Sequence, residues 1–148
     1  MTTYRIVFTG RPITKKNHGR ILMAGGRRIF TPSKQYKAYE DACGWQLKSQ
    51  WNGRPVEEAV SVMAKYYLPN RKSWPDLLGL EQATADILQH WGVLGDDGYI
   101  QDWDGSCIEG IDPEGPRVEI MIKECGKGEG LNALHPKLAK MPKGAKRK

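Results

Sequence analysis

A chain of 148 residues with 39% hydrophobic side chains is long enough for one domain with a buried core and too apolar for a disordered protein. It contains no apolar run of membrane-spanning length and no secretory signal pattern, so the sequence predicts a protein without membrane contact. The three cysteines form neither an even set nor a zinc-site spacing, which favours a reducing cytoplasm.

The net charge of +6 is distributed unevenly along the chain. Residues 1–39 carry basic side chains and no acidic ones, acidic side chains dominate residues 76–119, and residues 126–148 are basic again. Basic ends around an acidic middle suit a protein that binds a polyanion and processes it at a metal site. Solvated surfaces of mixed charge show the same pattern, and charge alone does not choose between the two interpretations.

The N-terminal part predicts a strand and a hairpin. Apolar and polar side chains alternate over 4–9, and Gly25 with Gly26 predicts a tight turn between two short apolar runs. Lysine and arginine in the loops would neutralise DNA phosphates without reading the base sequence, or would only be solvated. The predicted DNA-binding residues are Lys15, Lys16, Arg20, Arg27, Arg28, Arg71 and Lys72.

Two helices are predicted around a central strand. A capping Thr31 and apolar residues at helical spacing predict the first helix over 32–51. Its aromatic stripe is interpreted as core, and Cys43 as a small buried hydrophobe and not a nucleophile. Apolar even-numbered residues predict a strand over 60–68, and the second helix is predicted over 75–91.

Acidic side chains accompany the second helix. Asp76 lies in its first turn, three residues after a capping Ser73, where the helix dipole alone favours an acid. Asp96 and Asp97 follow the helix directly before a predicted strand, and a simple turn would also explain them. If the two elements bring these carboxylates to one point, a hard divalent cation can bind there.

The C-terminal part predicts a strand over 99–103, which residues 107–111 either continue or follow as a separate strand. A last strand over 118–122 is predicted to form a hairpin with the one before it. The fold is therefore predicted as α+β, a single domain with a mixed β-sheet and two main helices in the order β-β-β-α-β-α-β-β. The domain is predicted over 1–125, and a flexible basic tail over 126–148.

With these elements in place, the chain resembles the RusA family of Holliday-junction resolvases, which bacteria and phages carry. The resemblance spans roughly residues 4–124 and lies in the segments 12–17, 31–36, 75–88 and 92–100. The family motif on the central helix is Asp-x-Asp-Asn-Leu-x-Lys. Here Asp76 stands at the first Asp, while the second Asp, the Asn and the Lys are replaced by Leu78, Gly79 and Gln82. This departure suggests a divergent phage or prophage branch.

The resemblance implies a homodimer in the bacterial cytoplasm, encoded by the host or by a phage. It would cut four-way DNA junctions in recombination and repair with Mg²⁺ or Mn²⁺. The implied metal ligands are Asp76, Asp97 and Asp96, and the implied catalytic residues are Asp76, Asp97, Glu81 and Asp86. Glu81 is included because it lies three residues after Leu78, where its carboxylate would reach the place of the missing Asp.

Two alternatives stay open at this point. Leu78 and Gln82 suit a protein of the same fold that binds junctions without cutting them. The second alternative is an unrelated basic α+β domain such as an RNA-binding module, although the chain lacks the aromatic-rich basic strand typical of such modules. If the protein does cut DNA, Lys15, Lys16 or Lys72 would replace the missing Lys, and their spacing does not choose among them.

Overall fold

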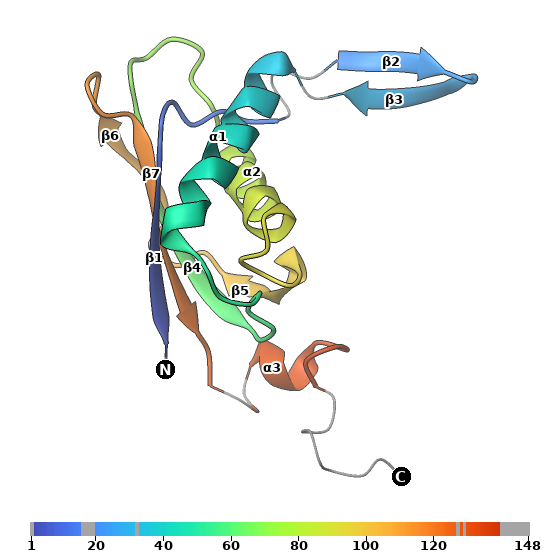
Figure 1. The fold of residues 1–148 in the computed structure, drawn as a ribbon, viewed down its shortest axis with the longest axis vertical. Coiled ribbons are helices and arrows are strands. Elements are labelled where there is room, and N and C mark those ends of the chain that lie inside the picture. The colour runs from blue at the N-terminus through green and yellow to red at the C-terminus, as the bar shows by residue number, and fades with distance from the viewer. Residues whose placement is uncertain (1, 16–19, 32, 127, 129, 140–148) are drawn as a thin grey trace.

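The computed structural model of the protein describes residues 2–15, 20–31, 33–126, 128 and 130–139. A sheet and two long helices form one body, and a two-stranded hairpin points away from it (Figure 1). In chain order the elements are β1 (Thr3–Thr9), β2 (Arg20–Ala24), β3 (Arg27–Thr31), α1 (Lys34–Gln50), β4 (Val60–Leu68), α2 (Leu77–His90), the 3₁₀ turn η1 (Asp97–Tyr99), β5 (Ile100–Asp102), β6 (Cys107–Ile111), β7 (Arg117–Glu124) and α3 (Leu131–Leu134). The predicted single-domain α+β fold with a mixed sheet and two main helices is confirmed.

Strand β4 lies at the centre of the five-stranded sheet. β7 pairs antiparallel with β4 on one side and with β1 on its other side. β5 and β6 both pair in parallel with β4 along the opposite edge. The predicted hairpin between β6 and β7 is therefore wrong, because the two strands lie on opposite sides of β4. A period-two pattern predicts a strand, but the partner of that strand depends on how the whole sheet buries its apolar face.

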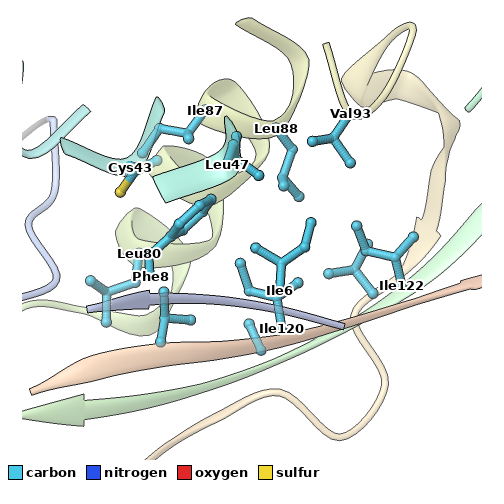
Figure 2. Close-up of a cluster of buried hydrophobic side chains, with 14 of the residues drawn as sticks. Ile6, Phe8, Cys43, Leu47, Leu80, Ile87, Leu88, Val93, Ile120 and Ile122 are labelled. Carbon is cyan, nitrogen blue, oxygen red and sulfur yellow. The ribbon is translucent and has the colours of Figure 1, made fainter. Parts of the chain in front are cut away.

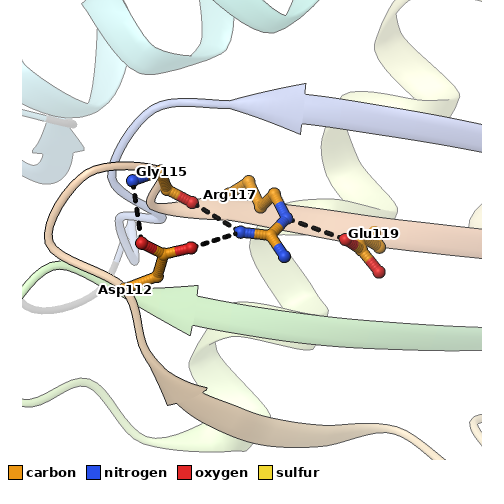
Figure 3. A network of polar contacts seen from close by, with 4 residues as sticks. All are labelled: Asp112, Gly115, Arg117 and Glu119. Carbon is orange, nitrogen blue, oxygen red and sulfur yellow. Dashed lines mark hydrogen bonds and ion pairs between the residues drawn. The ribbon is translucent and has the colours of Figure 1, made fainter.

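The connection from β6 to β7 crosses the end of β4 and is held by Arg117 (Figure 3). The guanidinium of Arg117 donates to Asp112 Oδ2 at 2.9 Å and to the Gly115 carbonyl at 2.8 Å. Its Nε donates to Glu119 Oε2 at 2.7 Å, and the guanidinium lies 3.9 Å from the centre of the Tyr67 ring. The hydrogen bond from Arg117 lowers the pKa of Asp112, so the turn is stabilised by charge as well as by geometry.

The core lies between the sheet and the two long helices (Figure 2). Alternate side chains of β1, β4 and β7 are buried against α1 and α2, as the period-two patterns predict. Cys43 of α1 is fully buried among them, and burial raises its pKa to about 12. This confirms Cys43 as a small core residue, since a thiol held in its protonated form is a poor nucleophile.

Both long helices begin slightly later than predicted. Ser33, and not Thr31, caps α1, because its hydroxyl accepts a hydrogen bond from the Tyr36 N–H at 3.0 Å. Ser73 does not cap α2, because it adopts a φ of 51° in the preceding turn. Asp76 occupies the N-cap position of α2, but its side chain makes no capping hydrogen bond. The carboxylate of Asp76 is therefore not held by the helix backbone.

Part of the predicted flexible tail, residues 126–148, packs on the domain. Asn132 of α3 is buried, and its Oδ1 accepts a hydrogen bond from the Ala59 N–H at 2.8 Å. Its Nδ2 donates to the Gly126 carbonyl at 3.0 Å. The side chain thus joins α3 to the segment before β4, while residues 140–148 lie outside the described part of the chain.

Replacing Asn132 with alanine is expected to release α3 and to lower the free energy of unfolding by about 1–3 kcal/mol, because the Ala59 N–H loses its partner. Denaturant unfolding measures the loss of stability, and hydrogen exchange at the Ala59 amide measures the release. Asn52→Ala is the matched control, since Asn52 is exposed. Unchanged exchange at Ala59 would show that α3 does not depend on this side chain.

Candidate active site

The acids singled out in the sequence lie at the two ends of α2. Asp76 occupies its N-cap, whereas the Asp97 N–H donates to Gln89 Oε1 in its last turn at 2.8 Å. At about 1.5 Å per residue, about 20 Å of helix separates Asp76 from Gln89. The expected meeting of the Asp76 and Asp97 carboxylates is therefore not found within one chain, because a continuous helix holds them apart.

At the start of α2, the Asp76 carboxylate lies against Gly79. A Cβ at Gly79 would lie 2.6 Å from Asp76 Oδ1 and 3.0 Å from Thr14 Cγ2, so a larger residue would displace one of them. The Thr14 hydroxyl is buried and has no hydrogen-bond partner among the described residues. Leu78 and Trp74 are exposed on either side of Asp76. This end of the helix thus presents one exposed carboxylate between apolar side chains.

At the far end of α2, the adjacent Asp96 and Asp97 have opposite environments. Asp96 Oδ1 accepts a hydrogen bond from the Gly98 N–H at 2.8 Å, and its Oδ2 lies 3.1 Å from Lys137 Nζ. These two contacts lower the pKa of Asp96. Asp97 is exposed, but partial desolvation raises its pKa, and the charges of Asp96 and Asp86 raise it further. Asp97 is therefore the better proton acceptor of the two.

Asp86, in the third turn of α2, faces the same space as Asp97. Lys15, in the loop after β1, places its Nζ 3.8 Å from Asp86 Oδ2. These side chains belong to a surface pocket of about 440 Å³, which we call the α1–α2 pocket. Its lining consists of Lys15, Glu40, Asp86, Gln89, His90 and Asp97. The structure thus brings Asp86 and Asp97 together beside Lys15 and leaves Asp76 outside.

Replacing Asp86 with asparagine is expected to lower the pKa of Asp97, because one of the negative charges that raise it is removed. A carbon-detected NMR titration of the Asp97 carboxyl measures this shift, with exposed Asp41→Asn as control.

A raised pKa of Asp97 means that the folded protein holds the Asp97 proton more tightly than the unfolded chain does. The unfolding free energy therefore falls as the pH rises from about 3.9 through the raised value, and D86N should reduce that fall. An unchanged Asp97 titration would contradict the proximity of the two carboxylates.

Glu81 does not line the α1–α2 pocket. It is half-buried, and burial raises its pKa. Its charge acts on Tyr66, whose pKa is raised first by burial and then by Glu81. The Tyr66 hydroxyl shares a hydrogen bond of 2.7 Å with Thr84 Oγ1 in the interior. No hydrogen bond or ion pair joins Glu81 to Asp76 among the described residues, so its replacement of the missing Asp stays a prediction.

The comparison with known protein families decides the relationship. The family model described as "Endodeoxyribonuclease RusA" matches residues 6–123, which is most of the chain. The chain belongs to the RusA family. It is also similar to a protein of Aquifex aeolicus (strain VF5) named "Crossover junction endodeoxyribonuclease RusA", with 27% identity over 89 residues, which cover 60% of this chain and 68% of that protein. The resemblance seen in the sequence is confirmed, and the protein is a member of a family of DNA-cutting enzymes.

The residues that depart from the RusA motif differ in their surroundings. Leu78 is 76% exposed and Gln82 is exposed as well, so neither is required by the core. Gly79 is buried and closely packed against Asp76 and Thr14. Two of the three departures are therefore surface features of this RusA protein, and the third is built into the packing at the start of α2.

RusA nucleases generally depend on a divalent metal, which allows a test of the metal ligands predicted from the sequence. Asp76 lies at the other end of α2 from Asp97, and Asp96 is already paired with Lys137. Within the described part of the chain, no group of three or more His, Cys, Asp or Glu side chains is arranged around one point. The set Asp76, Asp96 and Asp97 does not fit one cation in a single RusA chain.

The predicted DNA-binding residues fall in three places. Lys15 lines the α1–α2 pocket, Arg27 and Arg28 are exposed on the projecting β2–β3 hairpin (Figure 1), and Arg71 and Lys72 are exposed in the loop before α2. Lys16 lies outside the described residues, and of Arg20 only the backbone, at the start of β2, is described. The basic groups therefore surround α2 at both ends and extend beyond the RusA body along the hairpin.

Three residues of this region were missed by sequence reasoning. Glu40 lines the α1–α2 pocket, Gln89 holds the backbone of Asp97, and Lys137 pairs with Asp96. A signal for Glu40 was present, since it follows Tyr36 by four residues and so shares the buried face of α1. No local pattern could indicate Gln89 or Lys137, because their partners are brought to them by the RusA fold.

Proposed function

We propose that the protein is a structure-specific endonuclease that cuts four-way DNA junctions in recombination and repair. The match to the RusA family model over residues 6–123 carries this proposal. The name of the Aquifex aeolicus relative, a crossover junction endodeoxyribonuclease, supports the junction as substrate. The exposed arginines of the hairpin and the carboxylates of the α1–α2 pocket agree with it, since the first suit phosphate binding and the second suit hydrolysis.

Hydrolysis of a phosphodiester requires that a water loses a proton and that negative charge on the phosphate is neutralised. We assign the proton transfer to Asp97, because its raised pKa makes it a better base than an ordinary aspartate, with Asp86 beside it. Lys15 lies in the same pocket and is our candidate for the charge that the missing motif Lys would supply. The proposed cofactor is Mg²⁺ or Mn²⁺.

The direct test uses a labelled synthetic four-way junction and a linear duplex of matched sequence. The protein is incubated with each DNA in Mg²⁺, in Mn²⁺ and in a chelator. Paired nicks in opposite strands of the junction, with the duplex intact, are the expected result. Equal cutting of the duplex would contradict junction specificity, and undiminished cutting in the chelator would contradict the divalent cofactor.

A second candidate function is junction binding without cleavage. It is favoured by Leu78 and Gln82, which leave the family motif without its second acid and its lysine. Retarded but uncut junction DNA at every cation concentration would support this candidate over the nuclease. The RusA match favours both over the RNA-binding module that the sequence left open.

We propose a homodimer as the working form, because a four-way junction has two-fold symmetry and two strands must be cut. Light scattering of the purified protein measures the mass of the assembly, and a monomer at the concentrations that cut DNA would contradict this proposal.

Among the described residues, no helix has the length and apolar character that crossing a membrane requires. The bacterial cytoplasm stays a prediction from the sequence.

Replacing Arg27 and Arg28 with alanine is expected to weaken junction binding without affecting folding, because both side chains are exposed on a hairpin that projects from the body. If each contacts one phosphate, the slope of log affinity against log salt should fall in magnitude by about 2, since each contact contributes about 0.9. Titrations at several salt concentrations measure this slope. Arg54→Ala, at another exposed arginine, is the control. An unchanged slope would show that the hairpin does not contact DNA.

A further inference from the structure

A segment beyond the family match packs against the turn that contains the candidate base. The match to the RusA family model ends at residue 123, whereas α3 and the residues after it contact β5 and η1. We call residues 131–137 the C-terminal clamp. The clamp begins beside β5 (Figure 1), where the Leu131 N–H donates to Gln101 Oε1 at 3.3 Å. The buried Asn132 side chain anchors it to the domain.

His135 fixes the clamp on η1. Its imidazole packs edge-on against the ring of the buried Tyr99, with 5.2 Å between the ring centres. A Cβ at Gly98 would lie 3.4 Å from His135 Nε2, so the imidazole also lies against the backbone of η1. His135 Nδ1 accepts a hydrogen bond from the Lys137 N–H at 3.1 Å. The side chain that contacts Tyr99 therefore also fixes the backbone of Lys137.

Lys137 connects the clamp to the acids before β5. Its Nζ lies 3.1 Å from Asp96 Oδ2, while Asp96 Oδ1 accepts a hydrogen bond from the Gly98 N–H at 2.8 Å. Both carboxylate oxygens of Asp96 are thus engaged, one by the clamp and one by the backbone of η1. Asp97 follows directly, and its own N–H donates to Gln89 Oε1. The backbone around Asp97 is therefore held by α2 on one side and by the clamp on the other.

An exposed ion pair by itself would give Lys137 no special role. Its side chain is 61% exposed, and such pairs contribute little to stability. The clamp differs from a simple surface pair because a buried asparagine, a ring contact and a backbone hydrogen bond together bring this ammonium to Asp96. These contacts restrict geometry more than they add stability, and restricted geometry is what a reacting group requires.

We propose that the C-terminal clamp positions Asp97 for proton transfer, with Lys137 as a positioning residue that acts through Asp96. The proposal rests on the proposed nuclease function. In this role Lys137 does not touch the substrate. It holds Asp96, and thereby the peptide that joins Asp96 to Asp97, so that the Asp97 carboxylate stays in the α1–α2 pocket with Asp86. Misplacing a reacting group by about 1 Å costs about a hundredfold in rate, so even partial loss of the clamp should slow cleavage.

The test compares single-turnover cleavage of the labelled four-way junction by Lys137→Met and by the unmodified protein. K137M removes the ammonium and should cut at least about tenfold more slowly. Lys137→Arg should restore most of the rate, because a guanidinium also pairs with a carboxylate. The matched control is Lys123→Met, which removes an exposed ammonium from β7 and should cut at the unmodified rate. Cleavage by K137M at the unmodified rate would overturn the proposal.

Binding measurements separate positioning from a contact to DNA. Junction affinity, its salt dependence and the thermal unfolding midpoint of K137M should match those of K123M. If Lys137 instead contacted a phosphate, the slope of log affinity against log salt would fall in magnitude by about 0.9 relative to K123M. Such a fall would overturn the positioning role.

A double-variant cycle tests whether Lys137 acts through Asp96. Asp96→Asn removes the carboxylate that the ammonium contacts, so the double variant D96N/K137M should cut no more slowly than the slower single variant. A double variant slowed by the product of the two single effects would show that the residues act independently, and it would overturn the proposal.

Hydrogen exchange at the Gly98 amide, which donates to Asp96 Oδ1, measures the clamp without any DNA. Exchange in K137M should be at least about twofold faster than in K123M, because the Asp96 carboxylate is held less firmly. Equal exchange in the two variants would overturn the clamp, whether or not the protein cuts junctions. Faster exchange in K137M, combined with junctions that the unmodified protein leaves uncut, would overturn the proposed nuclease and not the clamp.

Discussion

Asparagine in place of Asp97 is expected to reduce the rate of junction cleavage at least about a hundredfold, the usual contribution of a positioned proton acceptor. The physical reason is that Asp97 combines a raised pKa with a backbone fixed by Gln89. The measurement is the single-turnover rate with protein in excess over labelled junction, so that weaker binding does not enter the rate. Junction affinity itself should not fall, because the substitution removes a negative charge and no contact to phosphate.

Asp104→Asn is the matched control for this experiment, since it makes the same change at an exposed acid in the loop after β5. A D97N protein that cuts junctions at the unmodified rate would remove Asp97 from the mechanism.

Asp76→Asn, tested in parallel, examines the other end of α2. Recovery of cleavage on mixing inactive D76N with inactive D97N would show that residues of two chains serve one site, and continued inactivity would show that each chain needs both acids.

If the homodimer brings the Asp76 end of one chain to Asp97 of the other, a double variant with Asp at position 78 and Lys at position 82 (L78D/Q82K) is expected to cleave junctions at least about tenfold faster than the unmodified protein, because it adds a carboxylate beside Asp76 and a cation for the phosphate. Both positions are exposed, so the free energy of unfolding should change by no more than about 0.5 kcal/mol. An added acid in the first turn of α2 is also favoured by the helix dipole. Single-turnover cleavage and thermal unfolding measure the two effects.

The buried Gly79 supplies a control for this gain. Adding Gly79→Asn completes the RusA motif in sequence, but its Cβ would lie 2.6 Å from Asp76 Oδ1 and displace that carboxylate. The triple variant L78D/G79N/Q82K should therefore be less active than the double variant, although it resembles the family motif more closely. A double variant no faster than the unmodified chain would show that the exposed positions do not limit cleavage.

The elements themselves were largely predictable because their patterns are local. The alternation over β1, β4 and β7 and the helical spacing in α1 and α2 reflect one buried face each, and the structure places those faces against the core. The pairing of β7 with β4 was not predictable in the same way, since any apolar strand face suits several neighbours. Asn132 was hidden for a related reason, because an asparagine in a glycine-rich, basic segment gives no sign that its amide reaches the Ala59 backbone.

The candidate site could be compared with the sequence only in its geometry, which was partly predictable. Asp86 and Asp97 do share a pocket, and Lys15 does lie beside them. Asp76 does not join them, although the helix predicted over 75–91 already separated the two acids. Recognising that α2 runs without a break from Asp76 to Gln89 would have shown the separation from helix rise alone.

The place of β7 in the sheet has a consequence for biosynthesis. Thr3 in the first strand pairs with Lys123 in the last, and β1 touches β4 only through β7. A nascent chain therefore cannot assemble this sheet until nearly the whole domain has left the ribosome. The backbone groups of β1 have no strand partner until β7 has been synthesised. Such long-range pairing slows folding, so chaperone dependence and aggregation during rapid expression are expected of this architecture.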